Sequence, residues 1–329
     1  MSKKKKVLVT MVAMALAVAA LCALAACSSP ATQRESEKLD VNADTAEKVT
    51  IETEPFWVLI TGNDTRVGTS QANKAMYADG NARTDTMMLA RVNPKDYRIT
   101  FVTIPRDTQD ALADGTICKI NEHYNHGGIQ ETLEAVKNLT GVTPKYYLNT
   151  TFVNFEDLVD KLGGIHTTVP LTVTMKDIVS GTKMTIPAGE NDLNGAETLI
   201  YARTRHDYED QLGLTNMEAY RQTADRKIMR TIVEKILSNA SSVEATTELL
   251  YGCLDTNWDL ASLKYIAKDF AEHADQVTFL SGTGPYVGDF IGPDGIWLAV
   301  RDEDTWAQVI DVANQDGDPS TVVEVLSID

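Results

Sequence analysis

Arginine and aspartate recur together in four short segments of this acidic chain. Six of its twelve arginines lie in these segments or at the start of a long predicted helix. The segments are Asp64-Thr65-Arg66, Arg83-Thr84-Asp85, Ile104-Pro105-Arg106-Asp107 and Arg203-Thr204-Arg205, and the helix carries Arg221. In an extended backbone, residues two apart point to the same side. Arg83 with Asp85, and Arg203 with Arg205, are therefore each expected to present two charged groups to one place.

This arrangement suits the binding of phosphate. Guanidinium groups match phosphate oxygens with two parallel hydrogen bonds. Asp64 follows a predicted strand and Asp85 begins one, so we expect their carboxylates to hold a common Mg²⁺, or alternatively Mn²⁺, together with substrate phosphates and water. The predicted chemistry is phosphoryl transfer, in which positioned cations stabilise charge that spreads over phosphate oxygens. The sequence leaves open which residue acts as a base.

Other readings of these residues compete with a phosphate site. A single Asp-x-Arg or Arg-x-Asp segment is typically a surface ion pair, and only the combination of segments favours a site. His123 and His126 have a spacing that zinc could use, but no third ligand stands nearby, so no zinc site is predicted. The chain contains no Gly-x-Ser-x-Gly elbow, Walker loop or His-Glu-x-x-His motif.

The elements that must position these residues alternate between strands and helices. Apolar runs predict strands at 56–60, 86–92, 99–104, 145–149, 165–169 and 277–280. Three- and four-residue apolar spacing predicts helices at 129–139, 155–162, 217–237, 260–273 and 304–313. Thr215-x-x-Glu218 reads as a capping box, and glycine-rich turns are expected at 282–285 and 292–295. The alternation predicts an α/β fold in one domain.

The N-terminus has the pattern of an export signal. Lysines at 3–6 precede an almost wholly apolar run at 7–26 that ends in Leu24-Ala25-Ala26-Cys27, which resembles a bacterial lipobox. Cys27 would then be acylated and anchor the protein on the outer face of the cytoplasmic membrane. A single uncleaved transmembrane helix is the alternative, because about 20 apolar residues can span a bilayer. Residues 27–52 are polar and read as a flexible tether, which leaves 53–329 as the catalytic domain.

Charge and cysteine content restrict the partners and the compartment. The formal net charge of −17 repels nucleic acid, so no nucleic-acid partner is predicted. Cys118 and Cys253 are the only cysteines after the lipobox. Outside the cytosol such a pair typically forms a structural disulfide, and two separately buried thiols are the alternative.

The order and spacing of these motifs resemble those of the LytR-CpsA-Psr proteins of bacterial envelopes. The resemblance runs from Val58–Arg66 through Arg83–Met87 and Ile104–Thr108, and continues in Lys119-Ile120-Asn121, Leu162–Ile165, Leu193–Gly195 and Tyr201–Asp207. It implies a three-layer α/β/α sandwich whose central sheet is mostly antiparallel or mixed. The resemblance also implies that this domain encloses a polyprenyl tail. It also implies a phosphotransferase that moves a glycopolymer from a polyprenyl pyrophosphate onto peptidoglycan or a surface protein, with pyrophosphatase activity in vitro.

The resemblance also implies roles for individual residues. Asp64 and Asp85 match the metal-binding aspartates. The positions that match the arginines binding the pyrophosphate are Arg83, Arg106, Arg203 and Arg205. Supporting substrate contacts are expected from Arg66, Lys119, Asn121, Asp207, Arg221 and Gln222.

One segment departs from the family pattern. After Asp207 the family usually has Asp-x-Gly-Arg-x-x-Arg-Gln, whereas here Tyr208 to Ala219 is longer and lacks the first arginine. Arg221-Gln222 keeps the second part, and Arg226 is a candidate replacement for the missing contact. This departure keeps a second hypothesis open, that of a carrier which binds polyprenyl phosphate without turning it over. A DNA-binding regulator is disfavoured by the acidic charge and the export signal.

Overall fold

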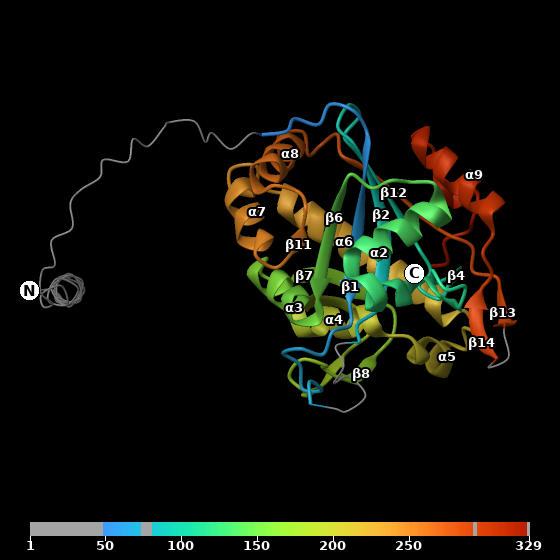
Figure 1. Ribbon diagram of the computed structural model, residues 1–329. Helices are drawn as coiled ribbons and strands as arrows, with labels where there is room; N and C mark the ends of the chain where they lie inside the picture. Colours follow the sequence, from blue (N-terminus) through green and yellow to red (C-terminus); the bar gives the residue numbers. More distant parts are fainter. Residues whose placement is uncertain (1–48, 74–80, 292–294, 328–329) are drawn as a thin grey trace, which may run out of the picture. The chain divides into compact units, whose positions relative to one another are not determined.

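A six-stranded mixed sheet forms the centre of the computed structural model, which describes residues 49–73, 81–291 and 295–327 (Figure 1). The strand order is β11-β6-β1-β2-β3-β12. In chain order the bounds are β1 Phe56–Asn63, β2 Thr84–Asn93, β3 Arg98–Thr103, β6 Tyr146–Thr151, β11 Asp255–Thr256 and β12 Thr278–Thr283. β1 is parallel to β6 and β3 is parallel to β12, while β2 runs antiparallel to both of its neighbours.

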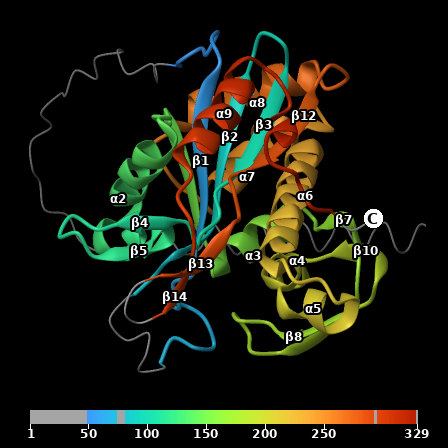
Figure 2. The ribbon, with the colours of Figure 1, turned by 90° about the vertical axis from the view of Figure 1, so that its right-hand side faces the viewer.

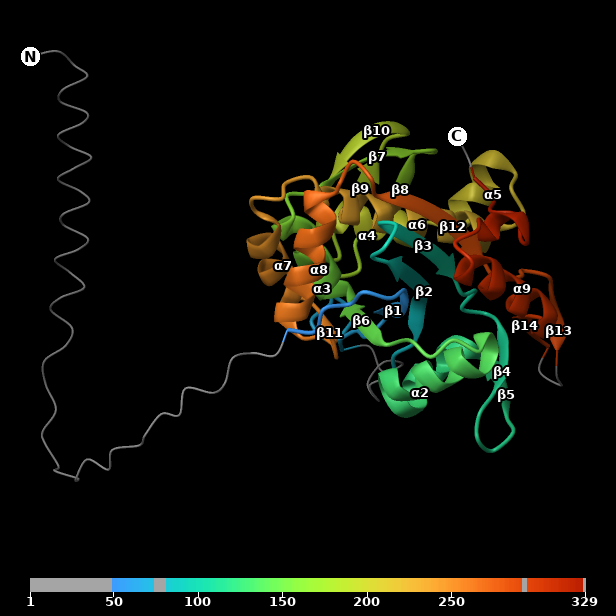
Figure 3. The same ribbon diagram turned by 90° about the horizontal axis from the view of Figure 1, so that it is seen from above.

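Helices cover both faces of the sheet (Figures 2 and 3). One face packs against α2 and α9, and the other against α6 and α8, with α7 beside α8. The bounds are α2 His123–Thr140, α6 Met217–Leu237, α7 Val243–Tyr251, α8 Leu260–Glu272 and α9 Glu303–Asn314. Neighbouring strand residues face opposite sides: Val58 packs towards α6 and α8, whereas Leu59 packs towards α2 and α9. The predicted α/β/α sandwich with a mixed central sheet is confirmed.

Shorter elements gather around this core. Figure 1 shows α4, α5 and β8 below the sheet. Three further helices have the bounds α3 Phe152–Lys161, α4 Gly195–Arg203 and α5 His206–Leu212, and the described residues include the 3-10 turns η2 Ile120–Glu122 and η3 Pro319–Thr321. In the same described ranges, four strand pairs lie outside the sheet: β4 Gln109–Ala111 with β5 Ile117–Lys119, β7 Ile165–Val169 with β10 Gly189–Leu193, β8 Val173–Lys176 with β9 Lys183–Ile186, and β13 Gly288–Ile291 with β14 Ile296–Ala299.

The predicted capping box at the start of α6 is wrong. The helix does begin at Met217, but its N-cap is Asn216, which makes no side-chain cap hydrogen bond. The side chain of Glu218 turns instead towards Arg221 of the same helix and towards Arg106 and Arg205 from other parts of the chain, and arginines attract a carboxylate more strongly than one backbone N–H. A complete capping box occurs at α4, between Asn194 and Glu197.

Two boundary predictions also differ from the structure. The turn expected at 282–285 is partly strand, because β12 continues to Thr283 and pairs with β3. Gly282 serves close packing there: a Cβ on it would lie 2.6 Å from a carbon of Pro319. α2 begins at His123, well before the predicted 129, and is kinked at Gly127 and Gly128. Most of the turn expected at 292–295 lies outside the described residues.

The predicted disulfide between Cys118 and Cys253 is also wrong, because both thiols are free and buried. Cys118 in β5 lies 4.0 Å from Nε2 of His123. Cys253 follows α7 and lies 3.3 Å from Oδ2 of Asp157. Burial raises the pKa of the Cys253 thiol, and the hydrogen bond to Asp157 raises it further. The alternative of two separately buried thiols holds.

The N-terminal boundary of the folded unit lies inside the expected tether. A compact unit runs from Glu47 to Asp329. The Thr50 N–H donates to the Ser262 hydroxyl, and the Glu52 carboxylate accepts from Tyr146 and Lys145. The export signal and the lipobox at Cys27 lie outside the described residues. Within the described ranges, none of the helices has the length and apolar character needed to cross a bilayer.

Candidate active site

The charged motifs converge at one end of the central sheet. Asn63 at the end of β1 pairs with Thr84 at the start of β2, and Thr103 at the end of β3 pairs with Met88. Because β2 runs antiparallel to both neighbours, the residues after β1 and β3 meet the first residues of β2. Sheet topology therefore brings Asp64, Asp85 and Arg106 to the same edge.

An arginine pocket of about 190 Å³ lies at this edge. Its charged lining residues are Asp85, Arg106, Arg203, Arg205, Arg221 and Asp225. Arg203 is the last residue of α4 and Arg205 is the N-cap of α5, so these two arginines reach the pocket from a helix junction and not from the expected extended strand. The Arg106 guanidinium donates to Oδ1 of Asp85 at 2.7 Å. The pocket presents guanidinium groups to any anion that enters it.

Glu218, which the sequence analysis assigned to a helix cap, is a central anion of this site. Its carboxylate contacts Arg221 at 2.5 Å, and it lies 3.5 Å from Nε of Arg106 and 3.6 Å from Nε of Arg205. Burial alone would raise the pKa of Glu218, but the three arginines outweigh burial and lower it to about 2. Glu218 is therefore a carboxylate at any physiological pH.

Asp225 is the second buried acid on α6. It accepts from Arg221 at 2.8 Å and from the Thr86 hydroxyl at 3.2 Å. Burial raises the pKa of Asp225 to about 6, and Arg221 only partly opposes the rise. Arg221 is thus held between two carboxylates, and its NH2 group also donates to the backbone oxygen of Asp85 at 2.9 Å. We conclude that Arg221 ties α6 to the start of β2.

Phe152, the first residue of α3, connects two arginines that the sequence analysis treated separately. The guanidinium carbons of Arg66 and Arg203 lie 5.2 Å and 5.3 Å from the centre of its ring. Burial lowers the pKa of Arg203, and the neighbouring Arg66 lowers it further. Cation–π contacts with one ring hold two like charges near each other in a poorly solvated place. No feature of the local sequence around Phe152 indicates this role.

Asp64 and Asp85 lie close enough to interact electrostatically. Burial raises the pKa of Asp64, and the Asp85 carboxylate raises it further. Asp64 accepts the Arg83 N–H at 2.7 Å and pairs with Arg66 at 3.2 Å. Two carboxylates near the arginine pocket suit the oxygen ligands that Mg²⁺ takes from protein. Among the described residues no group of three or more His, Cys, Asp and Glu side chains could hold a metal ion.

The other predicted site residues do not line the pocket. Arg83 directly precedes β2, and its half-exposed guanidinium lies 3.7 Å from Glu122. Lys119 pairs with the buried Asp107 at 2.6 Å, and the backbone N–H of Asn121 donates to the Arg106 oxygen. Asp207 lies in the first turn of α5 and, within the described part of the chain, forms no ion pair with the pocket arginines.

Gln222 and Arg226 are buried away from the pocket. Gln222 accepts from the Thr283 hydroxyl, and Arg226 donates to the hydroxyls of Thr103 and Thr223. Burial lowers the pKa of Arg226 to about 10. Arg226 therefore does not supply the arginine that the segment after Asp207 lacks.

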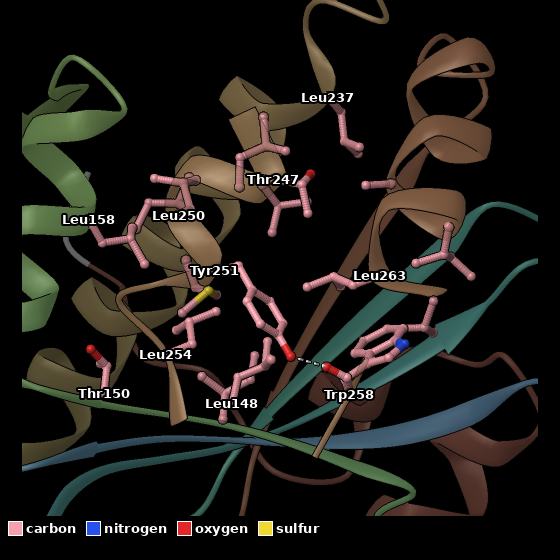
Figure 4. Close-up of a pocket in the computed structure, with 18 of the residues that line it drawn as sticks. Leu148, Thr150, Leu158, Leu237, Thr247, Leu250, Tyr251, Leu254, Trp258 and Leu263 are labelled. Carbon is pink, nitrogen blue, oxygen red and sulfur yellow. Dashed lines mark hydrogen bonds between the residues drawn. The ribbon is translucent and has the colours of Figure 1, made fainter. Parts of the chain in front are cut away.

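An apolar cavity adjoins the arginine pocket (Figure 4). Its volume is about 230 Å³, and it lies between the sheet and α3, α6, α7 and α8. Figure 4 shows Leu148, Leu158, Leu250, Leu254 and Leu263 around it. The Tyr251 hydroxyl is occupied by a hydrogen bond to the Trp258 oxygen. Residues that line both cavities are Ile60, Thr61, Thr150, Phe155 and Met229. A cationic pocket that shares lining residues with an apolar cavity suits an amphiphile with an anionic head and a hydrocarbon tail.

Comparison with known proteins identifies the class to which this fold and site belong. The model of the LytR_cpsA_psr family matches residues 24–313, and the chain belongs to this family. It is 31% identical over 288 residues to the polyisoprenyl-teichoic acid–peptidoglycan teichoic acid transferase TagU of Bacillus subtilis strain 168, which covers 83% of this chain and 82% of TagU.

Solved structures show the same fold. The crystal structure of B. subtilis TagV matches with a TM-score of 0.64 at 24% identity, covering 81% of this chain and 99% of TagV. TagT (YwtF) with bound octaprenyl pyrophosphate lipid matches with a TM-score of 0.53 at 21% identity, covering 80% of this chain and 90% of TagT. The family resemblance predicted from the motifs is confirmed.

Proposed function

We propose that this protein transfers a cell-envelope glycopolymer from a polyprenyl pyrophosphate carrier to peptidoglycan or a surface protein. The observation that supports this most is that the arginine pocket and the apolar cavity adjoin and share five lining residues. The names of the relatives agree, since TagU is a teichoic acid transferase and TagT holds a polyprenyl pyrophosphate. The hydrocarbon tail would occupy the cavity between the sheet and α6 to α8, and the pyrophosphate would bind among the arginines.

The chemistry follows from the charges in the pocket. A hydroxyl of the acceptor attacks the phosphorus that carries the glycopolymer, a new P–O bond forms, and the bridging P–O bond of the pyrophosphate breaks. The polyprenyl phosphate leaves with the electron pair, and a carboxylate of the site takes the hydroxyl proton. Arg106, Arg203 and Arg205 face the position where negative charge grows, and such pre-positioned cations lower the barrier. When water replaces the acceptor, the same step is hydrolysis.

Mg²⁺ is the proposed cofactor, with Mn²⁺ as the alternative. Asp64 and Asp85 would hold it, and the bound metal would neutralise charge on the phosphate oxygens. Aspartate-to-asparagine variants at both positions should raise the Mg²⁺ concentration needed for half-maximal turnover. A concentration that stays unchanged in both variants would count against a metal at these residues.

Turnover can be measured with the folded unit, residues 47–329, and a polyprenyl pyrophosphate. Wild-type protein should release phosphate in the presence of Mg²⁺, and Arg106→Ala should lower kcat at least about 100-fold, the usual cost of removing one transition-state donor. Arg230→Ala is the matched control, because Arg230 is exposed and pairs with Glu234 on the same helix. Tight binding of the lipid without turnover under any divalent metal would support the carrier instead.

The anchor is a separate proposal. We infer from the lipobox-like segment that Cys27 is acylated and holds the protein at the outer face of the membrane. Cys27→Ala should abolish acylation and leave an uncleaved precursor, which mass spectrometry of membrane fractions would detect. Unchanged mass and unchanged membrane attachment would favour a transmembrane helix.

A further inference from the structure

Glu218, the second residue of α6, is a buried carboxylate beside the arginine pocket. Its side chain is only 6% exposed, and its nearest charged partner is Arg221. The protein therefore buries a negative charge next to a pocket whose charged lining is mostly arginine.

The carboxylate of Glu218 lies near the Nε atoms of two arginines that line the pocket. Arg106 follows β3 and Arg205 precedes α5, yet both approach Glu218 through Nε, at 3.5 Å and 3.6 Å. Both also line the arginine pocket. A guanidinium that is attracted at Nε has its terminal nitrogens directed at other partners, and such nitrogens match phosphate oxygens. In Arg106 one terminal nitrogen, Nη1, already donates to Asp85.

Glu218 accepts hydrogen bonds from Arg221, but its contacts with Arg106 and Arg205 are weaker and purely electrostatic. Nε of Arg221 donates to both oxygens of Glu218 at 3.1 Å, whereas the Nε atoms of Arg106 and Arg205 have no hydrogen-bond partner within the described structure. Glu218 thus orients Arg106 and Arg205 by charge without a hydrogen bond that must break when they move towards an anion. The same negative charge repels that anion, since Coulomb forces are strong in a poorly solvated pocket.

We propose that Glu218 is a positioning residue that aims Arg106 and Arg205 at the pyrophosphate and limits how tightly the pocket holds it. This inference rests on the proposed function. It predicts that removal of the Glu218 charge separates binding from turnover: the anion binds more tightly, while the misaligned arginines stabilise the transition state less well.

The experiment compares the full-length protein in detergent with its Glu218→Gln variant. Calorimetry with inorganic pyrophosphate and Mg²⁺ gives Kd, and phosphate release from geranylgeranyl pyrophosphate gives kcat. In the variant, Kd should fall about tenfold because one repulsive charge is gone. The kcat should fall about 100-fold, the loss that a small misplacement of catalytic groups can cause. A merely structural role would lower binding and turnover together, in proportion to the folded fraction.

Two further variants make the outcome decisive. Asp316→Asn is the control: it removes the charge of a carboxylate that pairs with Arg91, and neither residue lines the arginine pocket. This variant should lower Tm without changing Kd or kcat per folded molecule. Glu218→Asp keeps the charge on a shorter side chain, so Kd should stay within about twofold of wild type while kcat falls about tenfold. This variant also decides the inference if Glu218→Gln does not fold.

Unchanged kcat or weaker pyrophosphate binding in a folded Glu218→Gln protein would overturn the inference. Wild-type protein that binds pyrophosphate but turns over no lipid would overturn the proposed function instead. The binding comparison between wild type and Glu218→Gln would then decide the inference by itself.

Discussion

At the scale of single residues, Phe152 makes the least expected contribution to the site. Its ring contacts the guanidinium groups of both Arg66 and Arg203, and each contact contributes about 0.5–2 kcal/mol. Phe152→Leu keeps an apolar side chain but removes the electron-rich ring face. We expect KM for a polyprenyl pyrophosphate to rise about tenfold, because the two arginines lose their common support. Steady-state kinetics with a Tm measurement would check this, and an unchanged KM in a folded variant contradicts the role given to the ring.

Glu156 on α3 provides a pH-dependent test at the same scale. Burial and the hydrogen bond with Asp177 together raise the pKa of Glu156 from 4.5 to about 8. Burial would also raise the pKa of Asp177, but hydrogen bonds from Ser180 and Glu156 outweigh burial and lower it. Glu156 therefore carries the proton that the two acids share.

The sign of the pH effect follows from this shift. Between pH 4.5 and about 8 the folded protein binds a proton at Glu156 that the unfolded chain has lost, so this group's contribution to stability falls as pH rises through that range. Glu156→Gln keeps a hydrogen-bond donor but cannot titrate. Urea midpoints between pH 5 and 8.5 should decline less steeply for the variant than for wild type. Parallel curves would show that Glu156 does not titrate in this range.

At the scale of elements, the crossing of α3 and α4 sets the spacing between Phe152 and Arg203. Gly195 begins α4 directly against α3: a Cβ on it would lie 2.2 Å from the backbone oxygen of Glu156. Gly195→Ala must push the two helices apart, which should cost about 1–3 kcal/mol, the usual cost of overpacking. Gly252→Ala is the matched control, because a Cβ there meets no atom within 4 Å and the φ of −64° suits alanine.

Denaturant unfolding of the two alanine variants measures this difference directly. The Gly252 variant should stay within about 0.5 kcal/mol of wild type, as surface substitutions usually do. The Gly195 variant should also bind pyrophosphate more weakly, since Arg203 at the far end of α4 moves with the helix. If the two variants were equally stable, the close packing of Gly195 against Glu156 would not be needed for stability.

At the scale of the whole molecule, the apolar cavity between the sheet and α6 to α8 is the feature that a lipid substrate requires. Ala267 on α8 lines this cavity, whereas Ala261 on the same helix lines a surface groove. Ala267→Phe should fill part of the cavity and weaken binding of a long polyprenyl pyrophosphate about tenfold, equivalent to about 1.4 kcal/mol. Inorganic pyrophosphate should bind as before, and Ala261→Phe should bind both ligands like wild type. If both variants lost affinity for the long polyprenyl pyrophosphate, the hydrocarbon tail would not bind specifically in this cavity.

Local patterns predicted much of the architecture. Apolar runs located β1, β2 and β3, and the spacing of apolar residues placed α6 at 217–237, where the structure has it. These predictions succeed because the side-chain periods of strands and helices are properties of the local backbone. Joint motifs also identified the family and most of the arginines that line the pocket.

The sequence by itself thus determined the fold class and the family and predicted an anionic ligand, whereas the tertiary structure decided the partner of each charge. Thr215-x-x-Glu218 satisfies a capping pattern, yet Glu218 pairs with Arg221 of the same helix and also with Arg106, which lies more than 100 residues earlier in the chain. Cys118 and Cys253 were predicted to form a disulfide but are buried with separate neighbours. The contacts of Glu218 with Arg106 and of Cys253 with Asp157 depend on which strands and helices become neighbours, and short-range patterns carry no record of that.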